Sequence, residues 1–183
     1  MAVLKVAKLG NPVLRLIAEP LAPERIRDDL EIQTLIDDMI DTMRMEKGVG
    51  LAAPQVSRSL RIVVLECLGS ERYPDKDGFP LMALINPVFT KRSRKTVKGW
   101  EGCLSLPDLR GLVPRSREVT LEAYDRMGER LTITTDGFLA VALQHEIDHL
   151  DGIVFLDRIP DLANLAYQEE FDTYWTEEGM VEI

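Results

Sequence analysis

Residues 137–150 read Gly-Phe-Leu-Ala-Val-Ala-Leu-Gln-His-Glu-Ile-Asp-His-Leu, and the rest of the chain can be arranged around them. Their apolar residues and both histidines recur every three to four positions, which predicts a helix. Residues four apart lie one turn above each other on a helix, so His145 and His149 can bind one metal ion. Glu146 stands beside them, where it can accept a proton from water on that ion. Because the chain holds only 2 histidines, two unrelated histidines at this spacing are the poorer interpretation.

A catalytic site with two histidines needs a third protein ligand and one open position. A third histidine of the kind found in one class of zinc protease is absent, because Phe155 stands in its place. A glutamate from a following helix is a second option, and Glu169 or Glu170 could supply it. The third option is Cys103, since the neighbouring Gly102 permits close approach of the backbone. The residues alone leave the last two options open.

The remaining segments form helical patterns at both ends of the chain and strand patterns between them. Helices are expected where apolar residues recur at helical spacing, over residues 28–45 and 161–176. Strands are expected where apolar and β-branched residues form short runs or alternate, over residues 62–68, 81–90, 96–106, 119–124 and 130–135. The small-residue stretch 48–55 is expected to be a loop, and 69–80 a long turn.

This order of elements favours an α+β fold over a doubly wound sheet. We expect mixed or antiparallel sheets packed around the central helix that carries the H-E-x-x-H motif, together with a C-terminal helix. At 183 residues, the chain fits one catalytic domain over residues 1–183.

Charge and composition exclude several classes of partner. The net charge of −9, from 22 basic and 31 acidic residues, disfavours DNA or other long nucleic acid as the main ligand. The basic residues between two predicted strands are expected to form a solvated hairpin turn, with ribosomal RNA contact as the alternative: Lys91, Arg92, Arg94, Lys95 and Lys98. No apolar run approaches the roughly 20 residues of a membrane span. Two cysteines and no signal-peptide pattern favour the cytoplasm.

Three stretches together resemble the signature motifs of the peptide deformylases, in the order of that family: Gly48-Val-Gly-Leu-Ala-Ala-Pro-Gln55, Glu101-Gly-Cys-Leu-Ser105 and Gln144-His-Glu-Ile-Asp-His149. The resemblance covers most of the chain up to about Asp157. It implies removal of the formyl group from N-formylmethionyl nascent peptides, with release of formate. It also implies one divalent metal ion and favours Fe²⁺ in the cell, while Zn²⁺, Ni²⁺ and Co²⁺ also suit a Cys/His/His set.

The resemblance further implies a role for individual residues of the reaction site. It assigns three metal ligands, which are Cys103, His145 and His149, and makes Glu146 the general base. Gln55 and the backbone N–H of Leu104 would stabilise the oxyanion of the tetrahedral intermediate. For Gln55, an amide that merely stabilises its loop is the alternative.

The substrate peptide is expected, by the same resemblance, to pair as a short strand with the backbone of Val49 and Gly50. Its methionine side chain would enter an apolar pocket formed by residues of the central helix, namely Phe138, Val141 and Ala142. Packing of the helix on the core explains the same stripe equally well. Arg110 matches a family arginine near the bound peptide, with an ordinary solvated arginine as the alternative.

Two further charged features need an explanation. Glu101 and Asp148 flank proposed ligands, and we expect them to pair with Arg115 and orient those ligands rather than be solvated. The chain from Asp161 to Ile183 holds seven acidic residues and no Lys or Arg. Some deformylases dock on the ribosome through a basic C-terminal helix, so the acidic tail predicts weak ribosome contact.

Two other functions share part of this pattern. A zinc endopeptidase would use the same H-E-x-x-H motif, but it lacks its usual third histidine here. A closed structural metal site would combine both histidines with Cys67 and Cys103. Structural sites usually pair cysteines two to four positions apart, whereas these two are far apart in the chain, and such a site would have no use for Glu146. Cys67 lies within an apolar strand pattern, which favours a buried thiol.

Overall fold

The computed structural model describes residues 2–68 and 78–175. Most of the long turn expected over 69–80, and Thr176 at the end of the expected last helix, lie outside the described residues. The helices are α1 (Pro23–Ile26), α2 (Leu30–Met45), α3 (Gly137–Leu150) and α4 (Gln168–Tyr174). The strands are β1 (Gly50–Ala52), β2 (Ile62–Cys67), β3 (Phe79–Arg92), β4 (Thr96–Cys103), β5 (Leu106–Ser116), β6 (Glu118–Tyr124), β7 (Arg130–Asp136) and β8 (Leu165–Tyr167).

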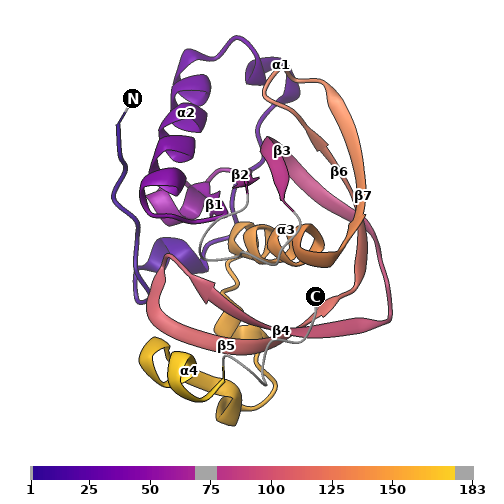
Figure 1. The fold of residues 1–183 in the computed structure, drawn as a ribbon. Helices are drawn as coiled ribbons and strands as arrows, with labels where there is room; N and C mark the ends of the chain where they lie inside the picture. The colour runs from indigo at the N-terminus through magenta and orange to yellow at the C-terminus, as the bar shows by residue number, and fades with distance from the viewer. Residues whose placement is uncertain (1, 69–77, 176–183) are drawn as a thin grey trace.

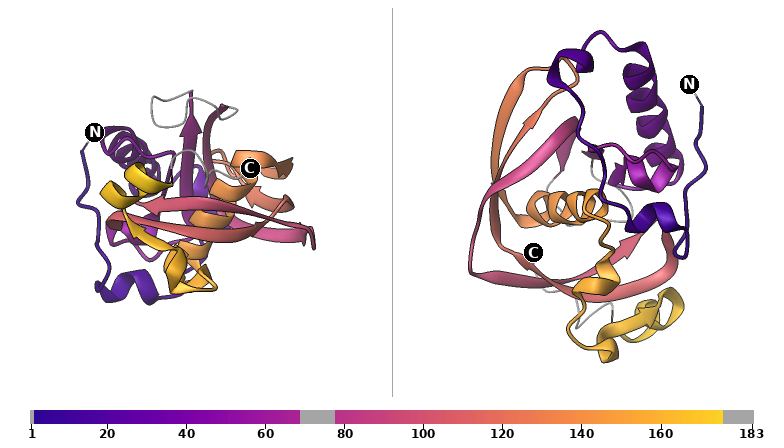
Figure 2. Two further views of the ribbon diagram at one scale, coloured as in Figure 1. Left: turned by 60° about the horizontal axis from the view of Figure 1, so that its bottom comes forward. Right: turned by 180° about the vertical axis from the view of Figure 1, so that it is seen from behind.

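Two antiparallel sheets enclose the central helix. Five strands form one sheet in the order β1-β2-β3-β6-β7, and three form the other in the order β4-β5-β8. Figures 1 and 2 show α3 between them, and it contacts β1, β2, β6 and β7 of the larger sheet and β5 of the smaller one. This arrangement confirms the expected α+β fold with antiparallel sheets around the helix that carries both histidines.

The central helix begins directly after β7. Gly137 has a φ of +62°, a left-handed conformation that glycine adopts without strain and that turns the chain sharply from strand to helix. Most side chains of α3 are buried, so the helix lies in the core rather than on the surface. Its predicted bounds, 137–150, are confirmed.

The N-terminal helix α2 covers one side of the larger sheet. The Asp29 side chain accepts hydrogen bonds from the backbone N–H groups of Glu31 and Ile32 and so fixes the start of the helix. Its apolar face includes Ile36 and Met39, which are completely buried in a cluster with residues of β1 and β2. The helix predicted over 28–45 is therefore confirmed. Within the described residues, no helix is long and apolar enough to span a bilayer.

The prediction that the basic residues form a hairpin turn between two strands is wrong. Strand β3 pairs with β6, whereas β4 pairs with β5, so the basic segment carries the chain from one sheet to the other. The cause is β5, a strand that the sequence analysis missed because two prolines and several charges interrupt its pattern. β5 pairs with β4 along nearly its whole length, from Thr96↔Ser116 to Glu101↔Gly111.

Two other expectations also need correction. The C-terminal helix is much shorter than the predicted 161–176, because residues 165–167 form β8 and pair with β5 at residues 109–111. The stretch 48–55, expected to be a loop, contains β1, which pairs with β2 from Gly50↔Leu65 to Ala52↔Val63. In both places, sheet pairing with a distant segment supplies hydrogen bonds that local sequence patterns do not indicate.

Candidate active site

Three side chains that can bind a metal converge where β4 ends against α3. The ligand atoms of Cys103, His145 and His149 all lie within 4.8 Å of one another. The Cys103 Sγ is 3.2 Å from the His149 Nε2. Glu169 and Glu170 are exposed and take no part in this group, so Cys103 is the residue that completes it. Cys67 is buried in the core cluster and also lies outside the group, which removes the closed structural site.

The chemistry of these three side chains fits a borderline divalent ion such as Zn²⁺ or Fe²⁺. Burial would raise the pKa of the Cys103 thiol, but the neighbouring His149 and His145 lower it well below its usual value. A thiolate is the form that binds metal. The His145 Nδ1 lies 2.8 Å from the Glu101 Oε2, which leaves the Nε2 of that ring for a metal. The buried His149 Nδ1 has no hydrogen-bond partner among the described residues.

A buried ion network holds His145 from behind, as the sequence analysis expected. The Arg115 guanidinium donates to both oxygens of Glu101, at 2.7 and 2.9 Å, and to Asp148 at 2.5 Å. Arg158 also donates to Asp148, at 2.8 Å. Burial alone would raise the pKa of Glu101, but its hydrogen bonds with Arg115, followed by those with His145, lower it to about 2. Glu101 is therefore a fixed anion that orients the His145 ring.

Glu146 is buried, and the described residues include no ion pair with its carboxylate. Its Oε2 has no hydrogen-bond partner in the described part of the chain. Burial is the main reason that its pKa rises to about 7. A Cβ atom at Gly50 would overlap the Glu146 carboxylate, so only glycine at position 50 leaves room for it. Gly50 was predicted from the sequence only to pair with the substrate strand, and this second requirement was missed.

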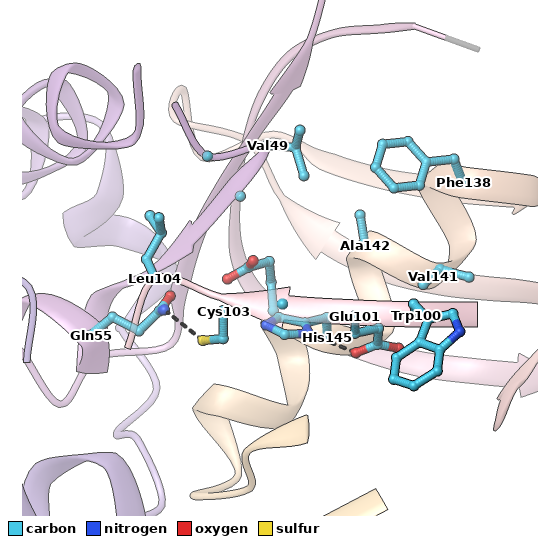
Figure 3. Close-up of a pocket in the computed structure, with 14 residues that line it drawn as sticks. Val49, Gln55, Trp100, Glu101, Cys103, Leu104, Phe138, Val141, Ala142 and His145 are labelled. Atoms are coloured by element: carbon cyan, nitrogen blue, oxygen red, sulfur yellow. Dashed lines mark hydrogen bonds and ion pairs between the residues drawn. The ribbon is translucent and has the colours of Figure 1, made fainter. Parts of the chain in front are cut away.

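Gln55 makes contacts that bear on both of the roles considered for it, and its role at the oxyanion stays a prediction. Its Oε1 accepts a hydrogen bond from the Ala52 N–H at 2.8 Å, which stabilises the loop. Its Nε2 lies 3.5 Å from the Cys103 Sγ and 3.2 Å from the Ser105 Oγ, so the amide donor faces the metal-capable group. Leu104 lies beside it in Figure 3. Ser105, which the sequence analysis did not select, also donates its N–H to Cys103, at 3.4 Å.

A cavity extends from this group along α3 (Figure 3). Its lining includes all five of the expected residues near the peptide strand and the apolar pocket, namely Val49, Gly50, Phe138, Val141 and Ala142. Arg110 does not line it. A Cβ atom at Gly102, which does line the cavity, would overlap the Arg110 guanidinium, so this arginine packs against the wall at Gly102. Trp100 is a further lining residue that the sequence analysis missed.

Comparisons with known proteins agree on one family. The polypeptide deformylase family model matches residues 3–164. Peptide deformylase 2 of Pseudomonas putida is 46% identical over 164 residues, which are 90% of this chain and 92% of that protein. The crystal structure of class I type b peptide deformylase from Acinetobacter baumannii with Met-Ala-Ser bound is 39% identical, with a TM-score of 0.83, and covers 86% of this chain and 99% of that one. The peptide deformylase of Thermotoga maritima has a TM-score of 0.78 at 32% identity, over 88% of this chain and 100% of that one.

Proposed function

This chain belongs to the peptide deformylase family of metal-dependent hydrolases, which remove the N-formyl group from nascent chains, and we propose the residues with which it does so. The observation that carries the proposal is the meeting of a Cys/His/His group with a buried glutamate that has an unpartnered oxygen. A metal site and a base within one cavity are the two parts that hydrolysis of an amide needs.

Cys103, His145 and His149 would hold one divalent ion, through the Cys103 Sγ and the Nε2 atoms of both rings. When bound, the ion would act as a Lewis acid that polarises the formyl carbonyl and acidifies a water molecule. The chain prepares for this by fixing the His145 ring through Glu101 and Arg115.

Glu146 would accept the proton of the attacking water and pass it to the amine of the departing peptide. A base works best when its pKa is near the working pH, and burial places the pKa of Glu146 at about 7. Gln55, through its Nε2, and the backbone N–H of Leu104 would donate hydrogen bonds to the oxyanion that forms on the formyl group. The position of the Gln55 Nε2 beside Cys103 supports this role.

The peptide would lie along Val49 and Gly50 as an added strand, with its methionine side chain between Phe138, Val141 and Ala142. The lining of the cavity supports this placement. Met-Ala-Ser, bound to the Acinetobacter baumannii relative, has the form of a product, since it is a formyl-Met-Ala-Ser peptide without its formyl group. Arg110, which packs against Gly102, would contact the peptide beyond methionine.

The direct test is formate release from formyl-Met-Ala-Ser by protein purified without oxygen. N-acetyl-Met-Ala-Ser is the matched control, because its extra methyl group tests whether the site accepts only formyl. We expect rapid release from the first peptide, little hydrolysis of the second and no activity after chelation. An active protein that stays active after complete metal removal would contradict the proposal.

We propose Fe²⁺ as the ion in the cell, with Zn²⁺, Ni²⁺ or Co²⁺ as possible occupants of the same thiolate and imidazole ligands. Activity should then decay in air and be protected by a reductant, and Ni²⁺ replacement should give an air-stable enzyme. Full activity for days in air, with iron shown by elemental analysis to be absent, would point to another native metal.

We also propose that ribosome contact is weak and that the enzyme works in the cytoplasm on chains that reach it. Glu169, Glu170 and Asp172 lie on α4, and negative side chains repel RNA. Truncation of the tail would expose the edge of β5, so charge reversal is the cleaner experiment. The Glu169→Lys/Glu170→Lys variant should co-sediment with ribosomes more strongly than the wild type at low salt. Tight, salt-sensitive binding by the wild type would contradict this proposal.

A further inference from the structure

The C-terminal helix α4 contacts the wall of the peptide pocket at Trp100. Trp100 lines the cavity together with Phe138 and Val141. In Figure 3 these three side chains lie at the end of the site remote from Cys103 and Gln55. The indole therefore borders the part of the cavity that would receive the end of the substrate side chain.

Trp100 reaches this position because of where it stands in β4. Burial alternates along the strand, with Glu101 and Cys103 buried toward α3 and Trp100 half-buried, so its side chain leaves the opposite face. β4 is also the edge strand of its sheet. A large side chain on an edge strand can reach past that edge and line the cavity beside it.

The contacts that hold the indole come from α4. Its ring centroid lies 5.1 Å from that of Phe171 and 5.3 Å from that of Trp175, with the rings tilted by 59° and 50°. Residues four apart share one face of a helix, so Phe171 and Trp175 both face Trp100. Tyr174, on another face of the same helix, is 70% exposed. One face of α4 thus packs against Trp100, while the acidic residues Glu169 and Glu170 of this helix are exposed.

We propose that Trp100 is a specificity-determining residue for the methionine side chain, and that Phe171 and Trp175 are positioning residues that hold its indole against the pocket. This inference rests on the proposed function and adds the C-terminal helix to the substrate site. A thioether sulfur makes favourable contact with an aromatic ring. Trp100 therefore favours methionine over norleucine, which has the same length but carries a methylene group in place of sulfur.

The test compares kcat and KM for formyl-Met-Ala-Ser and formyl-norleucyl-Ala-Ser in protein loaded with one metal. Trp100→Leu should raise the KM for the methionine peptide roughly 2- to 12-fold, the loss expected for aromatic contacts, and should remove the preference over norleucine. Phe171→Ala and Trp175→Ala should change KM and preference in the same direction, with kcat within about twofold, the margin we allow for a remote contact. Tyr174→Ala is the matched control and should behave as the wild type.

A double variant separates positioning from a general loss of stability. If Phe171 acts through Trp100, the Trp100→Leu/Phe171→Ala variant should be no worse than Trp100→Leu alone. Independent, additive effects, or a wild-type preference in Phe171→Ala and Trp175→Ala, would overturn the inference. Wild-type protein that releases no formate would instead overturn the proposed function, and this inference with it.

Fluorescence provides a readout that needs no turnover. The chain has 2 tryptophans, so Trp175→Phe keeps a ring beside Trp100 and leaves Trp100 as the single emitter. Addition of the peptide Met-Ala-Ser to the metal-loaded variant should change the Trp100 emission in a saturable way. Saturable peptide binding, measured by calorimetry, without any change in emission would show that the side chain does not reach Trp100 and would overturn the inference.

Discussion

On the side of the site formed by β4, Glu101 is buried against Arg115 and its pKa is lowered to about 2. On the side formed by α3, Glu146 is buried as deeply but has no arginine partner among the described residues, and its pKa is raised to about 7. Both carboxylates lie next to the same metal-capable group, and burial raises the pKa of both. The main difference is the guanidinium of Arg115, which compensates for burial at Glu101 and has no counterpart beside Glu146 in the described part of the chain.

The comparison shows how one site keeps a permanent anion beside a group that can take up a proton. Glu101 stays ionised at any working pH and can orient His145. Without a bound ion, the pKa of Glu146 lies near neutral pH, which suits a group that accepts and returns a proton. Variants that alter each carboxylate or its partner can remove the difference between the pKa values of Glu101 and Glu146, or measure its effect on activity and stability.

The largest effect is expected for Glu146→Gln. The amide keeps the size of the side chain but cannot accept a proton, so kcat should fall by roughly 10²–10⁴-fold. Metal content and melting temperature should stay close to those of the wild type, because Glu146 is not among the three metal-capable residues. Turnover and metal content should be measured on the same sample. Near-native kcat would mean that the base is elsewhere.

Arg115→Met should remove the guanidinium that compensates for the burial of Glu101. It leaves Glu101 without its main partner and Asp148 with Arg158 alone. Removing one partner of a buried ion pair typically costs about 3–5 kcal/mol, so denaturant unfolding should show a loss of this order. A loss below about 1 kcal/mol, as for an exposed pair, would show that Arg115 does not hold Glu101 in the folded protein.

The pH dependence of stability should have opposite signs at the two carboxylates. Because the pKa of Glu101 is lowered, its contribution is present above the ordinary value of 4.5 and is lost as the pH falls toward about 2. Because the pKa of Glu146 is raised, its neutral form is favourable at low pH and stability is lost as the pH rises from 4.5 through about 7. Unfolding of metal-free protein should show a flatter acid limb in Glu101→Gln and a flatter limb between pH 5 and 7 in Glu146→Gln. If the two variants give parallel curves, the two environments are not different.

The smallest effect is expected for Arg44→Met, which serves as an exposed reference for Arg115. Arg44 donates to both oxygens of Glu66, at 2.6 and 2.8 Å, with the same two-pronged geometry. Its side chain is 51% exposed, compared with 4% for Arg115. Exposed pairs contribute about 0–1 kcal/mol, so the change in unfolding free energy should stay below about 1 kcal/mol. A loss as large as that in Arg115→Met would show that geometry, and not burial, sets the cost.

The parts of the site that lie close together in the sequence could be predicted. Residues 137–150 carry the helix period, both histidines and the glutamate within a few turns, so the helix bounds and the spacing of the ligands follow from local geometry. Strands β6 and β7 surround a turn at Met127-Gly128 and were also predicted, because a hairpin pairs neighbouring segments. The pairing of Glu101 and Asp148 with Arg115 followed from placing charges beside buried ligands.

The parts that depend on distant pairing could not be predicted. β5 contains Pro107 and Pro114 and resembles a loop, yet it pairs with β4 and β8 and redirects the chain between the sheets. Trp100 and Phe171 are far apart in sequence, so their ring contact arises only after both sheets and α4 are in place. The clearance that Glu146 requires at Gly50 is likewise a property of the packed structure.

The three metal-capable side chains come from the three-stranded sheet and from the helix that lies between the two sheets. Cys103 ends β4 of the three-stranded sheet, while His145 and His149 belong to the helix that follows the last strand of the five-stranded one. A bound ion would therefore act as a cross-link between the end of β4 and α3, which share no backbone ladder in the described part of the chain. Chelation should speed amide hydrogen exchange in β4 and β5, while the hairpin of β6 and β7, whose ladder lies within one sheet, should keep its protection.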